Sequence, residues 1–129
     1  MAEKLTRILY VEDEPDIQTV ARLALETLGG FKVEICSSGN EALSRAPVFQ
    51  PQLILLDVMM PAMDGPSTLR MLRALPEFAS TPVVFMTAKV QPGEIEEYKK
   101  IGAVDVIPKP FDPMALPSQV RAIWERCHG

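Results

Sequence analysis

The residues best suited to chemistry in this sequence lie at the C-terminal ends of short apolar runs. They are Glu12, Asp13, Asp57, Thr87 and Lys109. Three carboxylates that crowd together repel one another, so they need a hard cation with oxygen ligands, for which Mg²⁺ fits best. A lysine and a hydroxyl beside that cation can neutralise and hydrogen-bond the oxygens of a phosphoryl group. These residue types therefore predict a cation-dependent phosphoryl site, provided that the fold brings them together.

The apolar runs predict five β-strands, all short and rich in Val, Ile and Leu. They cover residues 6–11, 32–36, 52–57, 82–86 and 104–107. Such runs are typical of strands that are buried on both faces of a sheet. Helical spacing predicts five helices, at residues 17–28, 40–46, 66–75, 94–101 and 114–126. Strands and helices that alternate in this way indicate an α/β fold, a doubly wound parallel sheet with helices on both faces.

Two of the expected helices carry signals at their ends. The first should stop at Gly29-Gly30, because glycine readily takes the left-handed conformation that ends a helix. The last should begin after Asp112-Pro113, which reads as a helix start, and Pro117 should bend this helix or delay its beginning.

Open parallel sheets bind ligands outside the carboxyl ends of their strands, where the strand order reverses. Taken singly, the candidate residues have ordinary explanations: Glu12 or Asp13 as a helix N-cap, Thr87 as a turn hydroxyl and Lys109 as a solvated charge. Together they occur at the ends of four of the five expected strands. This repetition favours a functional site.

Length and composition limit the classes of protein that remain. A chain of 129 residues is long enough for one ordinary domain and too short for two. Hydrophobic residues make up 47% and charged residues 23%, which predicts a globular core. The formal charge of −4 gives no basic field for direct nucleic-acid binding. The sequence contains no apolar stretch that could cross a membrane and no signal peptide. Its two cysteines are expected to be free thiols, and together these features favour the cytoplasm.

Five motifs make the chain resemble the receiver domain of two-component response regulators, the family that includes the chemotaxis regulator. They are Val11-Glu12-Asp13-Glu14, Leu55-Leu56-Asp57-Val58-Met59-Met60-Pro61, Asp64-Gly65, Met86-Thr87-Ala88 and Pro108-Lys109-Pro110-Phe111. The likeness covers nearly the whole length. It implies a flavodoxin-like strand order of 2-1-3-4-5. It also implies a single receiver domain over residues 1–129, either a stand-alone regulator or a piece of a longer protein.

The resemblance implies a phosphorylation switch centred on Asp57. Asp57 would accept the phosphoryl group as an acyl phosphate, Thr87 would hydrogen-bond this group, and Lys109 would pair with it. The donor would be a phosphohistidine on a sensor histidine kinase or a histidine phosphotransfer protein, because the chain has no glycine loop of the nucleotide-binding type. The protein is therefore not expected to be an enzyme beyond its own phosphorylation and dephosphorylation.

The same resemblance implies an Mg²⁺ site and no other cofactor. Asp13, Asp57 and the backbone carbonyl of Met59 would bind the ion directly, and Glu12 would act mainly through a bound water. In the family, the peptide bond that follows the lysine of the Lys-Pro motif is cis, and Pro110 makes this possible here.

The signal implied by the family leaves the site through the fourth helix, fifth strand and fifth helix. Its aromatic switch residue, three positions before the lysine, is replaced by Val106, whose side chain is stiff and has no ring to swing. Movement of residues 87–91 is expected to carry the signal instead. The implied output face presents Glu94, Glu96, Glu97, Lys99, Lys100 and Asp105.

Two other classes use a related layout. A phosphohydrolase of the haloacid dehalogenase type would place a second aspartate two residues after the nucleophile, where this chain has Met59. A flavin-binding module would carry a Ser-, Thr- or Gly-rich loop after the first strand, where Glu12-Asp13-Glu14 would repel a phosphate. The sequence leaves open the cognate kinase, the output partner and the pathway, as well as the choice between a monomer and a weak phosphorylation-dependent dimer.

Overall fold

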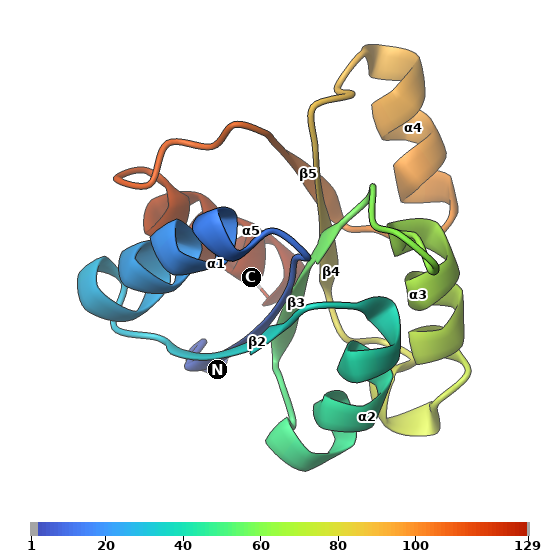
Figure 1. Cartoon of the computed structure of the whole chain (residues 1–129), viewed down its shortest axis with the longest axis horizontal. Coiled ribbons are helices and arrows are strands. Elements are labelled where there is room, and N and C mark those ends of the chain that lie inside the picture. The colour runs from blue at the N-terminus through green and yellow to red at the C-terminus, as the bar shows by residue number, and fades with distance from the viewer. Residues whose placement is uncertain (1–2, 129) are drawn as a thin grey trace.

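The five apolar runs form strands, and these pair side by side as one parallel sheet (Figure 1). The computed structural model describes residues 3–128. Within that range the strands lie in the order β2-β1-β3-β4-β5, which confirms the prediction. Their bounds are β1 (Arg7–Val11), β2 (Lys32–Cys36), β3 (Leu53–Asp57), β4 (Val83–Thr87) and β5 (Asp105–Pro108).

Within residues 3–128, five α-helices cover the two faces of this sheet. Figure 1 shows α1 and α5 on one face and α2, α3 and α4 on the other. Their bounds are α1 (Pro15–Arg22), α2 (Gly39–Phe49), α3 (Gly65–Arg73), α4 (Pro92–Lys100) and α5 (Leu116–His128). A π-helical segment, Leu23–Leu28, continues α1, and a short 3₁₀ turn, Pro76–Phe78, follows α3. The predicted doubly wound α/β architecture is therefore confirmed.

Alternation along each strand divides the buried side chains into two cores. Successive residues of a strand point to opposite faces of the sheet. In β1, Ile8 and Tyr10 belong to the core beneath α1 and α5, whereas Leu9 and Val11 belong to the core beneath α2 and α3. Glu12, two positions beyond Tyr10, therefore starts on the side of the sheet that α1 and α5 cover.

The prediction that all five strands are buried on both faces is wrong for β2 and β5. Every residue of β3 and β4 is buried, but Lys32 of β2 and Pro108 of β5 are exposed. The reason is the position of these strands, because β2 and β5 form the two edges of the sheet and border solvent along one side.

The helix bounds also differ from the prediction. The second helix runs through Pro47 to Phe49, three residues past the expected end, although proline usually interrupts a helix. The last helix begins at Leu116, two residues after the expected start, so the expected delay is observed. Pro117 occupies its first turn, where the missing N–H costs nothing. The first helical stretch stops where predicted, and Gly30 after it has a positive φ of 73°.

Parallel pairing places the carboxyl ends of neighbouring strands at one edge of the sheet. Val11 pairs with Leu56, Asp57 with Met86, and Thr87 with Pro108. The strand ends that carry the candidate residues are therefore adjacent in space. None of the helices within residues 3–128 has the length and apolar character that spanning a membrane requires.

Candidate functional site

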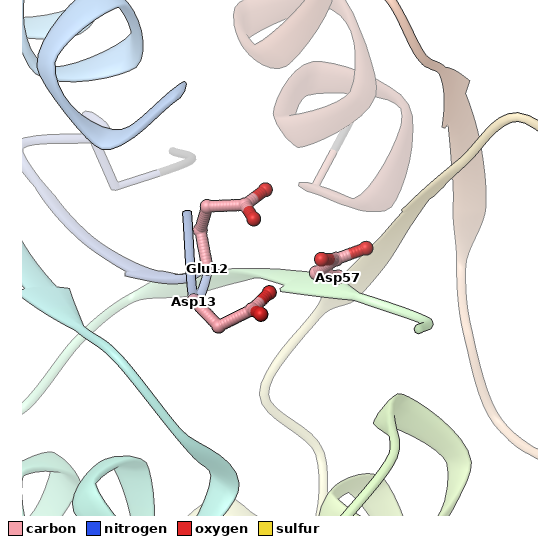
Figure 2. A group of neighbouring side chains, drawn as sticks. All are labelled: Glu12, Asp13 and Asp57. Atoms are coloured by element: carbon pink, nitrogen blue, oxygen red, sulfur yellow. The ribbon is translucent and has the colours of Figure 1, made fainter. Parts of the chain in front are cut away.

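Three carboxylates meet at the carboxyl edge of the sheet. Glu12 and Asp13 follow β1, Asp57 ends β3, and one oxygen from each lies within 4.8 Å of the others. Figure 2 shows the three side chains rising from the two neighbouring strand ends, with those of Glu12 and Asp13 extending toward Asp57. Glu12 and Asp57 are buried and Asp13 is partly exposed. Such a set of oxygen donors, one side open to solvent, fits a hard divalent cation.

A close backbone approach constrains the main chain at Asp57 and Val58. The loop after β3 turns back so that the N–H of Gly65 donates to the carbonyl of Val58 at 2.9 Å. A Cβ atom at Gly65 would lie 2.6 Å from the carbonyl oxygen of Asp57 and 2.9 Å from Cα of Val58. Glycine is therefore required for this close approach, which explains the Asp64-Gly65 motif. Asp64 itself caps α3 by accepting a hydrogen bond from the N–H of Ser67.

Lys109 brings a positive charge to the carboxylates. Its Nζ lies 2.8 Å from Oε1 of Glu12 and 3.4 Å from Oδ1 of Asp57. Burial works against the ammonium charge, but the hydrogen bond to Glu12 and the charges of Asp57 and Glu12 outweigh it, so the pKa of Lys109 is raised. The lysine is therefore charged at neutral pH. The peptide bond between Lys109 and Pro110 is cis, as the resemblance implied.

The carboxyl group of Asp57 is an unusually weak acid for an aspartate. Burial and the charge of Glu12 raise its pKa to about 6, against the opposing effect of Lys109. A bound divalent cation would favour the ionised form, because an opposite charge nearby stabilises the carboxylate. A bound cation would therefore reduce the repulsion among the carboxylates and would favour the ionised form of Asp57.

Thr87 ends β4 next to these residues. Its Oγ1 accepts a hydrogen bond from the N–H of Lys89 at 3.0 Å, and its backbone carbonyl accepts one from the N–H of Lys109 at 2.9 Å. The first of these bonds uses a lone pair of the hydroxyl, so its proton can be donated to another oxygen. Thr87 is buried, and the hydrogen bond from Lys89 restrains its hydroxyl.

Met59 begins the loop after Asp57. Its backbone nitrogen lies 3.4 Å from Oδ1 of Asp57, a long and weak hydrogen bond, and the exposed fraction of the residue is 64%. The backbone at Met59 thus borders the carboxylate cluster. The role of its carbonyl as a metal ligand stays a prediction.

Three contacts to Glu12 were not predicted from the sequence. Its Oε1 accepts a hydrogen bond from the hydroxyl of Tyr10 at 3.2 Å, its Oε2 one from the N–H of Glu14 at 3.1 Å, and its backbone carbonyl one from Nε2 of Gln18. Burial, and after it the charge of Glu12, raises the pKa of Tyr10 above its usual value, so the hydroxyl keeps its proton. The period of two along a strand was the available signal, because it places Tyr10 and Glu12 on one face.

The family of the chain follows from its match to a model of the response regulator receiver domain, which covers residues 8–121. The chain belongs to this family. Response regulator Rre1 of Synechocystis sp. is 36% identical over 126 residues, which are 98% of this chain and 54% of Rre1. The alkaline phosphatase synthesis transcriptional regulatory protein PhoP of Bacillus subtilis is 37% identical over 120 residues, 93% of this chain and 49% of PhoP. The chain thus spans about half the length of these curated relatives.

Solved structures confirm the flavodoxin-like fold. The chemotaxis response regulator CheY4 of Vibrio cholerae superimposes with a TM-score of 0.86 at 28% identity, covering 93% of this chain and 99% of CheY4. The signal receiver domain of a signal transduction histidine kinase from Syntrophus aciditrophicus gives a TM-score of 0.80 at 32% identity, covering 94% of this chain and 91% of that domain. The predicted family and the predicted fold are both correct.

Proposed function

We propose that this receiver domain is a phosphorylation-dependent switch in which Asp57 accepts a phosphoryl group from a phosphohistidine on a partner protein. The observation that carries the proposal is the cluster of Glu12, Asp13 and Asp57, with Nζ of Lys109 within 3.4 Å of the Asp57 carboxylate. A buried nucleophile beside cation ligands and a fixed positive charge is the arrangement that phosphoryl transfer needs.

The transfer is a single displacement at phosphorus. A carboxylate oxygen of Asp57 forms the new P–O bond while the P–N bond to the donor histidine breaks, and the electron pair of that bond returns to the imidazole. Lys109 pairs with the phosphoryl oxygens, and the hydroxyl of Thr87 donates a hydrogen bond to one of them. Asp57 must be ionised to attack.

The metal proposed for this site is Mg²⁺, held directly by Asp13, Asp57 and the carbonyl of Met59, with Glu12 acting through water. When bound, it supplies charge neutralisation for the carboxylates and the phosphoryl oxygens. The chemistry of the donors supports this choice, because they are all oxygens of carboxylates or carbonyls.

The proposed output runs through α4, β5 and α5. All residues of α4 are at least partly exposed, so the helix is held by few buried contacts and can shift. Of the charged residues expected on this face, Glu94 caps α4 by accepting from the N–H of Gln91, and Asp105 pairs with Arg126. The exposed charges that remain for a partner are Glu96, Glu97, Lys99 and Lys100.

The donor is proposed to be a sensor histidine kinase or a histidine phosphotransfer protein, and the output partner is left unspecified. The single-domain organisation, the cytoplasmic location and the oligomeric state stay predictions. The dehalogenase-type alternative lacks support because Met59 offers no acid group, and the flavin alternative because the first strand is followed by carboxylates.

Mass spectrometry after incubation with acetyl phosphate and Mg²⁺ tests the proposal. The wild type should gain the mass of one phosphoryl group, and Asp57→Asn should gain none. An Asp16→Asn variant is the matched control, since Asp16 is exposed on α1 and should leave the reaction unchanged. Phosphorylation of Asp57→Asn, or equal phosphorylation of the wild type in EDTA, would refute the assignment.

A further inference from the structure

Glu12 is a fully buried carboxylate whose two oxygens have different partners. Oε2 accepts a backbone hydrogen bond from Glu14, whereas Oε1 accepts two side-chain hydrogen bonds, from Lys109 at 2.8 Å and from the hydroxyl of Tyr10 at 3.2 Å. The exposed fraction of Glu12 is 0%. A buried charged acceptor that loses its donors is costly, so the identity of the second donor on Oε1 matters.

Lys109 has two tasks that compete. In this structure its Nζ lies 2.8 Å from Oε1 of Glu12 and 3.4 Å from Oδ1 of Asp57, so it is closer to Glu12. Under the proposed function the same ammonium group pairs with the phosphoryl group on Asp57. As Nζ moves from Glu12 toward the phosphoryl group, its hydrogen bond to Oε1 of Glu12 lengthens and weakens.

Tyr10 is placed to keep Oε1 of Glu12 paired when the lysine moves away. Its ring is fully buried in the core beneath α1 and α5, so the hydroxyl cannot turn to solvent. Tyr10 lies on β1, two positions before Glu12, whereas Lys109 follows β5. The tyrosine therefore stays on Oε1 when the lysine leaves.

We propose that Tyr10 is a positioning residue that keeps the buried Glu12 carboxylate paired and thereby frees Lys109 to engage the phosphoryl group on Asp57. This inference rests on the proposed function of Asp57. Without the hydroxyl, Lys109 would be the remaining side-chain donor to Oε1 and would be retained by Glu12.

Binding of beryllofluoride, a non-transferable analogue of the phosphoryl group, tests this in the full chain at saturating Mg²⁺. Tyr10→Phe should weaken beryllofluoride binding about tenfold, the effect expected for one hydrogen bond to a buried charge. Tyr98→Phe is the matched control, because Tyr98 lies on α4 against Phe85, away from the carboxylates, and its loss of a hydroxyl should change little.

A double-mutant cycle with Lys109→Met separates this role from a purely structural one. If Tyr10 acts by freeing the lysine, Tyr10→Phe should have almost no effect on beryllofluoride affinity once Lys109 is absent. A loss that is equal in both backgrounds, or no loss in either, would overturn the inference. Mg²⁺ affinity and the thermal unfolding of each variant, measured in parallel, establish that the site is folded. Should Tyr10→Phe fail to fold, Tyr10→Met, which also removes the hydroxyl, replaces it in the same cycle with the same expected result.

Failure of the inference and failure of the proposed function give different results. If the wild type itself binds no beryllofluoride with Mg²⁺ and gains no phosphoryl mass, the proposed function is wrong. If the wild type does both and Tyr10→Phe binds beryllofluoride as tightly, the role of Tyr10 alone is wrong.

Discussion

At the scale of single residues, the site combines one carboxylate that resists ionisation with a lysine that is charged. The raised pKa of Asp57 has its origin in burial and in the neighbouring Glu12. This means that the ionised Asp57 destabilises the metal-free folded protein, since the unfolded chain ionises the same group more easily. The reactive form of the site is therefore maintained at a cost in stability, as is common for functional groups.

Replacing Asp57 by Asn should stabilise the metal-free protein at pH 7. The pKa of Asp57 is about 6 in the folded protein against an ordinary value of 3.8, so the folded state binds the proton more tightly. The wild type should thus gain stability as the pH falls from about 6 to about 4, and the Asn variant should not. The free energy of unfolding of the Asn variant is expected to exceed that of the wild type by about 1–3 kcal/mol at pH 7, and the difference should vanish near about pH 4.

Urea unfolding of both proteins in EDTA across this pH range measures the difference. Asp16→Asn provides the comparison for loss of an exposed aspartate on α1. A difference between Asp57→Asn and wild type that does not depend on pH would contradict the assigned cause.

The lifetime of the phosphorylated state should depend on the residues that flank the path of the hydrolytic water. Met59 and Lys89, two positions after Asp57 and Thr87, are both exposed, and neither side chain can activate a water. We expect slow self-dephosphorylation. The double variant Met59→Asn, Lys89→Glu should speed phosphate release roughly tenfold, because its polar groups can orient the water.

Phosphate release at fixed Mg²⁺ measures this rate. Met71→Asn is a suitable control, since Met71 is also an exposed methionine but lies on α3. A double variant that decays no faster than the wild type would mean that access at these positions does not set the lifetime.

At the scale of elements, the loop between β3 and α3 is constrained by Gly65. Gly65→Ala should destabilise the protein by about 1–3 kcal/mol, because its Cβ would force the backbone at Asp57 and Val58 to move. It should also slow phosphorylation. Gly93→Ala is the control: a Cβ at Gly93 meets nothing within 4 Å, and alanine in the first turn of α4 should stabilise by about 0.4–1 kcal/mol.

Unfolding and phosphorylation rates of the two alanine variants, compared directly, test this constraint. Equal stability of the two variants would show that the loop can relax around Gly65.

The elements themselves were largely predictable, and the exceptions have physical causes. The end of β3 at residue 57, and that of β4 to within one residue of 87, are visible because an apolar run stops at a polar residue. The extension of α2 through Pro47 could not be predicted from the sequence, since it depends on how Ala46 and its neighbours pack against the core. The exposure of β2 and β5 depends on strand order, which the apolar runs alone do not encode.

The candidate site was predicted from one geometric rule, that parallel strands end at the same edge of a sheet. That rule placed Glu12, Asp13 and Asp57 together, and the structure brings their oxygens within 4.8 Å. It could not give the hydrogen bond from Tyr10, because a tyrosine within an apolar strand looks like a core residue. Its hydroxyl acquires meaning once the position of the Glu12 carboxylate is known.

At the scale of the whole molecule, the proposed signal must pass from Asp57 to the α4–β5–α5 face. Lys109 lies on that route, since its side chain reaches Asp57 and its backbone N–H binds the carbonyl of Thr87. Val106 packs against the core beneath α2 and α3, and has no ring to move. The lysine and the loop after Thr87 are therefore expected to carry the change.

Lys109→Ala should still accept a phosphoryl group but should fail to transmit it. Amide chemical-shift changes upon phosphorylation should be much smaller at residues 87–106 than in the wild type. Lys32→Ala, which removes an exposed lysine of β2 at the opposite edge of the sheet, should leave them unchanged. Shifts in Lys109→Ala as large as in the wild type would show that the lysine is dispensable for the switch.

The pairing of Lys109 with Glu12 also has a mechanical consequence. It joins the ends of β5 and β1, two strands that are not neighbours, because β3 and β4 lie between them. The ion pair thus bridges β5 and β1 at the carboxyl edge of the sheet, beside the nucleophile Asp57. Under the proposed function, phosphorylation weakens the tie between β5 and β1 and strengthens the existing tie between β5 and β3, whose Asp57 already lies 3.4 Å from the lysine.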